Sequence, residues 1–332
     1  FTATPFANIF IDPDTDSDML GDDLFPRDFI YTLEAPSNYL GPTVVFGDDA
    51  SITRPIFDAD PLLGGLRSDS AVAAIPESLA RALRSFLIVN AVRDLRGHLN
   101  THRSMLVNVS GYTNVQSQVA TQLGLLLTDI QRDVRLYARL DPSEALRSGH
   151  IQQLRETWDE EHNDGSHEWR EVQHALHDAV QPVQVREVNQ RTGAASLDYR
   201  AYAEHGLRVI AVGGNSLSRG LTLEGLSTSY FYRNSQMYDT LLQMGRWFGY
   251  RDGYGDLCRI WLTEEAEGWY SHITRASDEL REELKRMRRL DLTPKDFGLK
   301  VRGHPDALIV TARNKMRTAK EIVREVSLDT KG

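Results

Sequence analysis

The chain has 332 residues, of which 41% are hydrophobic and 26% charged, and its net charge is −9. No apolar run approaches the roughly 20 residues that cross a bilayer, which argues against a membrane protein. The single cysteine, Cys258, excludes an intramolecular disulfide and fits a reducing cytoplasm. The negative charge argues against a protein that coats nucleic acid, yet residues 275–324 hold 14 Lys or Arg against 8 Asp or Glu. We therefore expect one basic face on an acidic body.

Apolar runs and turn residues predict the elements in chain order. Before residue 101 they predict short strands at 28–33 and 43–46 and a helix that begins near Ile75, where Pro76 suits a first turn. From residue 102 on, strand and helix alternate. The predicted strands are 104–110, 183–188, 207–212, 228–232 and 257–262; the predicted helical segments are 113–127, a polar insertion at 129–182, and 264–289. This alternation predicts an α/β fold with a mostly parallel sheet covered on both faces.

A glycine-rich run, Gly213 to Thr222, directly follows the strand predicted at 207–212. A loop of this kind at the carboxyl end of a parallel strand is where α/β sheets bind ligands, because its backbone N–H groups are free. A plain strand-to-helix turn is the alternative interpretation. The run lacks GxGxxG spacing, and neither GxxxxGKS nor GxxxxGKT occurs in the chain, so no Rossmann or Walker A loop is predicted.

The run from Gln243 to Arg251, QMGRWFGYR, combines two arginines, two glycines and three aromatic residues. Arginine offers a rigid fork of donors that matches phosphate oxygens, and it stabilises the charge that develops in phosphoryl transfer. Gln243 and Arg246 are three residues apart, so on a helix they would project from one face. The alternative is the end of an interface helix with surface arginines.

Other patterns indicate less. The opening Phe1 to Pro5, FTATP, is by itself typical of a turn after a strand. The polar stretch at 162–177 holds four histidines, but such clusters on a polar helix are usually solvated, so we expect no metal site. The string Glu283-Leu284-Lys285 lies in a highly charged helix and indicates a salt-bridge pattern rather than a nuclease centre.

Taken in order, three of these runs resemble motifs of superfamily 2 helicases. FTATP resembles motif III, SRGLT at 218–222 resembles motif V, and QMGRWFGYR resembles motif VI, the arginine-finger segment. Motif IV would then fall near Asn108 and Ser110. Two departures from the usual motifs stand out: Thr222 replaces the Asp that usually ends motif V, and five positions separate Arg246 from Arg251 where three is usual.

The wording of four strings is similar to one bacterial family, the Z1 domain, which occurs in helicase-like ATPases beside restriction genes and is also described as an endonuclease. The strings are TATPFAN, GGNSLSRGLTLEGL, QMGRWFGYR and DFGLKVRGHPDALIVTARNKMR, the last at 296–317. The resemblance implies that the sheet is a RecA-like second helicase lobe. The implied domains are the end of a first RecA-like lobe and a following segment at 1–60, a helical linker at 61–101, the second lobe at 102–263, and a family-specific basic region at 264–332.

The resemblance also implies a role for individual residues. Arg246 and Arg251 would be catalytic, reaching the γ-phosphate of ATP. The nucleotide-binding residues would be Gln243, Gly220, Thr222 and Arg219, and the residues coupling ATP to the nucleic-acid track would be Thr2 and Thr4. The DNA-binding residues would be Ser110, Asn215, Ser216, Arg302, Arg313, Lys315 and Arg317, of which the first three would contact the phosphate backbone.

Together these features predict the C-terminal part of a DNA-dependent ATPase or translocase in a restriction-type system. Because Phe1 falls inside a motif, we expect a piece of a longer protein, whose N-terminal RecA-like lobe would hold ATP and Mg²⁺; this chain alone would bind neither and would be inactive. Double-stranded DNA and a nuclease subunit are the expected partners. Two alternatives stay open: a DNA endonuclease in its own right, and a non-catalytic adaptor that binds a nuclease subunit.

Overall fold

The computed structural model describes residues 28–47, 51–189, 197–214, 217, 221–232, 241–242 and 244–294. The chain divides into two compact units. The larger contains Ala35–Ser235 and Gln243–Thr274, and the smaller contains Phe1–Glu34, Gln236–Leu242 and Arg275–Gly332.

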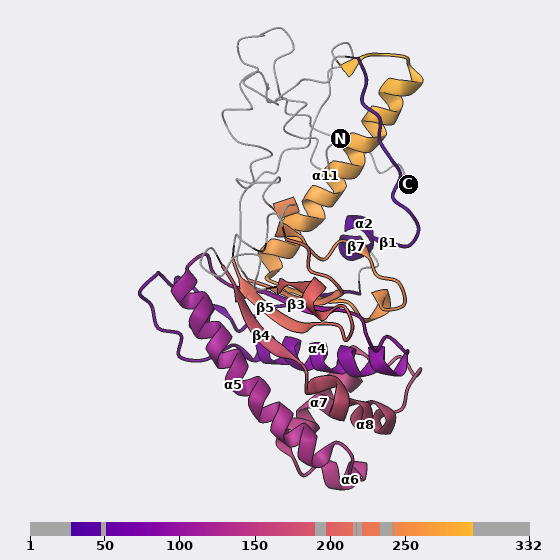
Figure 1. Ribbon diagram of the computed structural model, residues 1–332. Helices are drawn as coiled ribbons and strands as arrows, with labels where there is room; N and C mark the ends of the chain where they lie inside the picture. The colour runs from indigo at the N-terminus through magenta and orange to yellow at the C-terminus, as the bar shows by residue number, and fades with distance from the viewer. Residues whose placement is uncertain are drawn as a thin grey trace, which may run out of the picture. The chain divides into compact units, whose positions relative to one another are not determined.

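The centre of the larger unit is a six-stranded sheet in the order β2-β8-β6-β3-β5-β4, in which every neighbouring pair is parallel (Figure 1). Its strands are β2 (Thr53–Pro55), β3 (Arg103–Asn108), β4 (Gln184–Val188), β5 (Arg208–Gly213), β6 (Leu226–Phe231) and β8 (Arg259–Leu262). Every residue of β3, β5 and β6 is buried, and β3 and β5 have the apolar runs typical of strands buried on both faces, whereas β6 has buried Ser and Thr at its centre. The predicted α/β fold, its mostly parallel sheet and the five strands predicted after residue 102 are confirmed.

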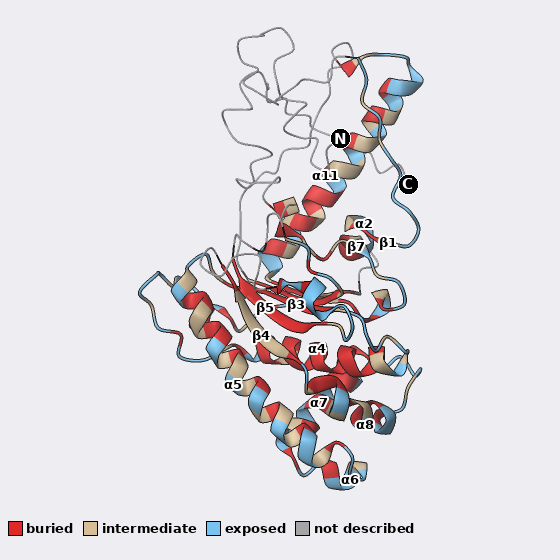
Figure 2. Ribbon diagram, viewed as in Figure 1, coloured by how far each residue is buried: buried red, intermediate tan, exposed pale blue. Residues whose placement is uncertain are grey.

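One face of the sheet is covered by helices in two layers. Helix α4 (Glu77–Leu95) packs directly on the sheet, and α5 (Thr113–Tyr137) packs on β4 and β5. The segment expected as an insertion forms the end of α5 together with α6 (Pro142–Ala145), α7 (Gly149–Glu161) and α8 (Trp169–Val180). Helices α7 and α8 pack against α4, so α4 is buried nearly all round, as Figure 2 shows.

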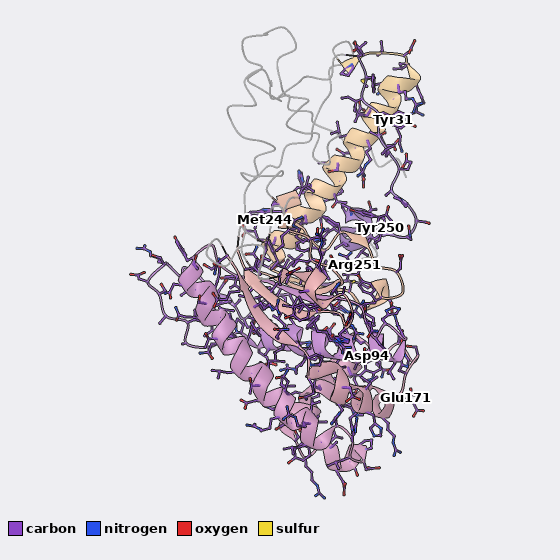
Figure 3. All side chains as sticks on the ribbon, viewed as in Figure 1. Tyr31, Asp94, Glu171, Met244, Tyr250 and Arg251 are labelled. Carbon is purple, nitrogen blue, oxygen red and sulfur yellow. The ribbon has the colours of Figure 1, made fainter. Side chains whose placement is uncertain are left out.

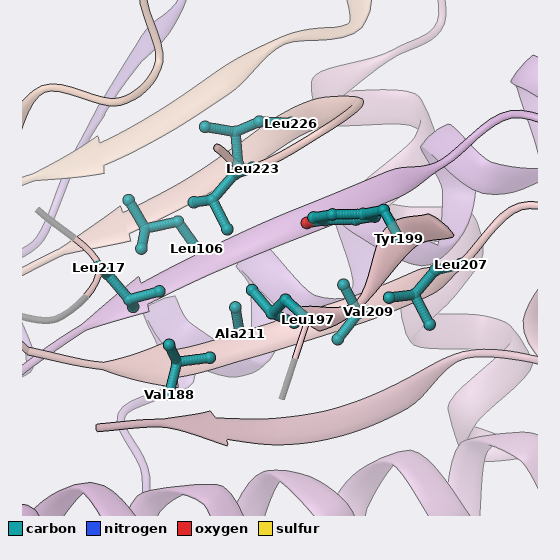
Figure 4. Close-up of a cluster of buried hydrophobic side chains, with 10 residues drawn as sticks. All are labelled: Leu106, Val188, Leu197, Tyr199, Leu207, Val209, Ala211, Leu217, Leu223 and Leu226. Atoms are coloured by element: carbon teal, nitrogen blue, oxygen red, sulfur yellow. The ribbon is translucent and has the colours of Figure 1, made fainter. Parts of the chain in front are cut away.

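The other face of the sheet carries an apolar cluster (Figure 4). Side chains of β5 alternate between the two faces: Val209 and Ala211 join the cluster, while Arg208 points to Asp94 of α4. The short helix η3 (Tyr199–Tyr202) lies on the cluster side, where the Tyr199 hydroxyl is 2.7 Å from Ser104 Oγ. Its ten members are Leu106, Val188, Leu197, Tyr199, Leu207, Val209, Ala211, Leu217, Leu223 and Leu226.

Shorter elements complete the larger unit. They are α2 (Pro42–Phe46), α3 (Asp60–Leu63), η4 (Gly255–Leu257) and a small antiparallel sheet of β1 (Tyr39–Leu40) and β7 (Gly249–Tyr250). The strand predicted at 43–46 is wrong, because Pro42 starts a helix there. The strand predicted at 28–33 is also wrong, since that segment has no regular secondary structure.

Helix α11 (Glu264–Arg289) confirms the final predicted helix and runs from the larger unit into the smaller one. Within the smaller unit its last turns contact the segment at 30–34. Lys285 Nζ lies 2.9 Å from Glu34 Oε1, and the Arg288 guanidinium lies over the Tyr31 ring at 4.5 Å. Across the described ranges, no helix has both the length and the apolar character needed to span a membrane.

Candidate functional site

The parallel strands end at one edge of the sheet, which we call the carboxyl edge; its described residues are those that end or follow β3, β5 and β6, namely 109–112, 213, 214, 217 and 232. The opposite, amino edge comprises the residues just before these strands and β8, namely 101–102, 207, 224–225 and 254–258. Open α/β sheets bind ligands outside the carboxyl ends of their strands. The two edges differ in chemistry.

Ser110 shapes the turn from β3 into α5 at the carboxyl edge. Its Oγ accepts the backbone N–H of Tyr112 at 3.1 Å, and its carbonyl accepts Gln116 Nε2 at 2.9 Å. Helix α5 begins with no side-chain cap and no acidic residue of its own in its first turn, and the Glu187 carboxylate accepts from Ser117 Oγ in the following turn. Ser110 therefore lies beside a helix end suited to an anion.

The first two glycines of the 213–222 run are explained by packing. A Cβ on Gly213 would lie 2.2 Å from the carbonyl oxygen of Val188, and one on Gly214 would lie 2.6 Å from Gln116 Nε2 and 2.9 Å from the Ser110 carbonyl. Neither distance is tolerated by a side chain. These glycines let the end of β5 approach both β4 and the Ser110 turn, which brings the glycine-rich run and Ser110 together.

The QMGRWFGYR run does not continue as a helix. Met244 is helical, but Gly245 to Phe248 form a turn and Gly249–Tyr250 form β7. The expectation that Arg246 projects from a helix is therefore wrong. The reason is the tryptophan: Trp247 is 3% exposed, and its ring lies 5.5 Å from that of Phe231 and 5.1 Å from that of Tyr270, so the chain must turn to bury it.

Arg246 connects two of the predicted motifs. Its Nε donates to the carbonyl of Leu217 at 3.0 Å, and Leu217 is a buried member of the apolar cluster. Within the described residues the two Nη groups of Arg246 make no hydrogen bond or ion pair. The side chain is partly buried, and this desolvation lowers its pKa, although the guanidinium remains charged at neutral pH because its ordinary pKa is so high. Arg246 thus presents a fork of donors at the carboxyl edge.

Arg251 lies elsewhere. Its Nη1 donates to the carbonyl of Tyr250 at 2.8 Å and its Nη2 to that of Trp247 at 3.1 Å. Its own carbonyl accepts the N–H of Tyr254 at 3.1 Å, and burial raises the pKa of the Tyr254 hydroxyl against the opposing charges of Arg251 and Arg93. Figure 3 shows Arg251 near Tyr250, whose carbonyl it binds. The described hydrogen bonds of Arg246 and Arg251 are made to different segments, Leu217 for the first and the Trp247–Tyr250 turn for the second.

Tyr254 belongs to the amino edge. The Arg93 guanidinium lies 4.0 Å from its ring centroid, and Arg93 Nη1 donates to the carbonyls of His102 and Gly225, which precede β3 and β6. The chain from Arg246 to Tyr254 therefore crosses from one edge of the sheet to the other.

Most of the other predicted site residues cannot be placed. Of those described, Ser110 lies at the carboxyl edge as above and Thr222 is exposed. The remaining predicted residues lie outside the described ranges: Thr2, Thr4, Asn215, Ser216, Arg219, Gly220, Gln243, Arg302, Arg313, Lys315 and Arg317.

The amino edge holds a charge network that the sequence patterns did not indicate. Asp94 on α4 pairs with Arg103 Nη2 at 2.5 Å and with Arg208 Nη2 at 2.9 Å, and the three side chains are 12%, 0% and 8% exposed. Desolvation, assisted by the charge of Arg208, lowers the pKa of Arg103 to about 10. No sequence signal links Asp94 to Arg208, which is 114 residues away.

The histidine-containing stretch also has a structural explanation. His162 is buried and its Nε2 lies 2.7 Å from Ser85 Oγ, while Glu171 forms a capping box with Glu168 at the start of α8. In the part of the chain that the structure describes, no three His, Cys, Asp or Glu residues are arranged to hold a metal ion.

The fold defines the class: an α/β domain with a parallel sheet, whose carboxyl edge carries glycines at the end of β5 and an arginine with no Nη partner among the described residues. The Z1 domain model matches residues 78–308, and the chain belongs to the Z1 domain family. The match covers the sheet from α4 onward and both candidate runs, Gly213 to Thr222 and Gln243 to Arg251. Searches of curated proteins and of solved structures find no match to this chain.

Proposed function

We propose that this Z1 domain supplies the second RecA-like lobe of a DNA-dependent ATPase of superfamily 2 type, acting in an ATP-dependent restriction system. The observation that carries the proposal is Arg246. A buried tryptophan and the carbonyl of Leu217 hold this arginine at the carboxyl edge of a parallel sheet, and its two Nη groups remain available within the described residues. A guanidinium held in this way fits a phosphoryl group whose charge increases in the transition state.

ATP with Mg²⁺ would supply the phosphoanhydride bond and the metal that neutralises its oxygens. Neither GxxxxGKS nor GxxxxGKT occurs in the 332 residues, so a first lobe would hold the nucleotide. The residues described here fit only one side of such a site: Arg246 provides donors and fixed positive charge without a carboxylate partner. Desolvation of its side chain strengthens that charge's interaction with an anion.

Double-stranded DNA is the proposed track, and a nuclease subunit is a proposed partner. Support for the first comes from the carboxyl edge, where Ser110 and the uncapped start of α5 offer donors and a positive dipole end to a phosphate. Contacts of this type position the backbone and do not read sequence. The basic residues Arg302, Arg313, Lys315 and Arg317 are proposed to extend the same surface, and Thr2 and Thr4 to couple it to ATP.

The test is steady-state ATP turnover by the full-length protein with and without duplex DNA. We expect Arg246→Ala to lower DNA-stimulated kcat by about 10³-fold or more, the range that an arginine finger contributes in other phosphoryl-transfer enzymes. Arg132→Ala on the exposed face of α5, where the side chain is 63% exposed, is the matched control and should leave kcat unchanged. Unchanged turnover in Arg246→Ala with retained biological activity would instead support an adaptor. Plasmid cleavage with Mg²⁺ or Mn²⁺ that is lost on changing a single acidic residue would support an endonuclease.

A further inference from the structure

The two arginines of the QMGRWFGYR run differ in how their donors are used. An arginine has five N–H donors, one on Nε and two on each Nη, and the planar fork binds a phosphate most readily through Nη donors that no other acceptor uses. Arg246 uses its Nε on Leu217 and leaves both Nη groups without a partner among the described residues. Arg251 uses Nη1 on the Tyr250 carbonyl and Nη2 on the Trp247 carbonyl.

The carbonyls that Arg251 binds belong to the turn that presents Arg246. Trp247 directly follows Arg246, and Tyr250 directly precedes Arg251, so the Arg251 guanidinium bridges the two ends of the segment between the arginines. Trp247 is in turn fixed in the aromatic cluster with Phe231 and Tyr270. Arg251 therefore holds both ends of the Trp247–Tyr250 turn, which begins directly after Arg246.

Gly249 shows that the position of Arg251 is built into the run. Its φ is +145°, which side chains rarely adopt, and a Cβ there would lie 2.8 Å from Arg251 Nη1 and 3.5 Å from its Cζ. The guanidinium thus packs directly against the glycine backbone. The second glycine of QMGRWFGYR is therefore explained by its positive φ and by the close approach of the Arg251 guanidinium.

The spacing of five positions between Arg246 and Arg251 also fits two arginines with different partners. Five positions separate the arginines, and a chain of that length can span up to about 17 Å. Here it passes from Leu217 at the carboxyl edge to Tyr254 at the amino edge. The two guanidinium groups have different described partners: Arg246 donates to the Leu217 carbonyl, and Arg251 donates to the carbonyls of Tyr250 and Trp247.

We propose that Arg246 alone faces the nucleotide and that Arg251 is a positioning residue, which acts by fixing the Trp247–Tyr250 turn behind Arg246. The inference rests on the proposed ATPase function and divides its two candidate catalytic residues into two roles.

The test compares Arg246→Ala, Arg251→Ala and Gly249→Ala in the full-length protein, with steady-state ATP turnover measured in the presence of duplex DNA and with added guanidinium. Guanidinium should restore part of the activity of Arg246→Ala, since that side chain would leave a vacancy facing the phosphate. Arg251→Ala should lower kcat by only about 10- to 10²-fold, the cost of misplacing a group by about 1 Å, and guanidinium should not restore it. Gly249→Ala should match Arg251→Ala because its Cβ displaces the same guanidinium, and the double variant should add little.

Near-ultraviolet circular dichroism supplies a readout independent of turnover. Arg251→Ala and Gly249→Ala should change the aromatic signal of the Trp247 cluster, while Arg246→Ala should not; Arg251→Lys should restore part of it through one carbonyl. If Arg251→Ala lowers kcat as far as Arg246→Ala, with an unchanged aromatic signal and with rescue by guanidinium, the positioning role is overturned and both arginines are fingers. If Arg246→Ala turns over ATP like wild type, the proposed function itself fails, which is a different outcome.

Discussion

The two edges of the six-stranded sheet use arginine in opposite ways. At the amino edge, Arg103 and Arg208 are buried and both are paired with Asp94. At the carboxyl edge, Arg246 has one hydrogen bond to a carbonyl and, within the described ranges, no acidic partner. A buried arginine whose terminal nitrogens pair with a carboxylate is committed to the fold, whereas one held by a single carbonyl retains donors for a ligand. The burial of the side chain does not distinguish a structural arginine from a ligand-binding one, but its hydrogen-bond partners do.

Replacing Asp94 tests this comparison most directly, because we expect it to cause the largest loss of stability. Asp94→Ala leaves two buried guanidinium groups without their carboxylate, so we expect the free energy of unfolding to fall by about 3–5 kcal/mol. Urea unfolding of the purified chain measures it. Asp129→Ala is the control: Asp129 is 50% exposed and its partner among the described residues is Arg132 in the same helix, so its loss should cost less than about 0.5 kcal/mol. If Asp94→Ala and Asp129→Ala lower the free energy of unfolding equally, the Asp94 network contributes no more to stability than a surface ion pair.

Close packing at the carboxyl edge gives the next effect. Gly214→Ala places a Cβ against Gln116 and the Ser110 carbonyl, and we expect a loss of about 1–3 kcal/mol as the turn is displaced. Gly124→Ala in α5 is the matched control, since nothing lies within 4 Å of its added Cβ. A glycine in a helix interior costs about 1 kcal/mol relative to alanine, so that control should gain stability. A stable Gly214→Ala protein would show that the edge has room for a side chain.

The free energy of unfolding should decrease in acid because of His162, which is buried and contacts Ser85 of α4. Burial, with the charges of Arg259 and Arg54, holds the pKa of His162 well below its usual value. Below about pH 6.5 the unfolded chain takes up a proton at this histidine and the folded protein does not, so stability present above that pH is lost as the pH falls, by at most about 1.4 kcal/mol per unit. His162→Gln should flatten the fall between pH 6.5 and 5, while His205→Gln, at a side chain 85% exposed, should leave it as in wild type.

The smallest expected effect is the most informative one. Arg246→Ala should change the free energy of unfolding by no more than about 1 kcal/mol, because it removes a single neutral-acceptor hydrogen bond at a partly exposed position. Urea unfolding beside the Asp94→Ala measurement gives the comparison directly. A loss of several kcal/mol would place Arg246 with the structural arginines and remove the main support for a phosphate-facing role.

Local patterns predicted the sheet and missed the contacts that depend on distant residues. Buried parallel strands have continuous apolar runs, so β3 and β5 could be predicted from the sequence, whereas Pro42 turned a predicted strand into a helix. The functional role predicted for the arginines of QMGRWFGYR stays a prediction, and the helix expected around Arg246 is wrong because nothing local shows that Trp247 would be buried against Tyr270. The pairing of Asp94 with Arg208 joins residues 114 positions apart, and no periodicity or motif encodes it.

Helix α5 offers an internal length standard for measuring the motion that the proposed two-lobed ATPase would require. It starts beside the Ser110 turn and ends where Gln173 of α8 donates to the carbonyl of Ala138, and at about 1.5 Å per residue its 25 residues span roughly 37 Å. Tyr112 and Leu136 are 47% and 61% exposed, so spin labels at these two sites would report a fixed internal separation. Against that constant length, any distance to a label on the rest of the protein that changes with nucleotide measures the displacement of the lobe itself.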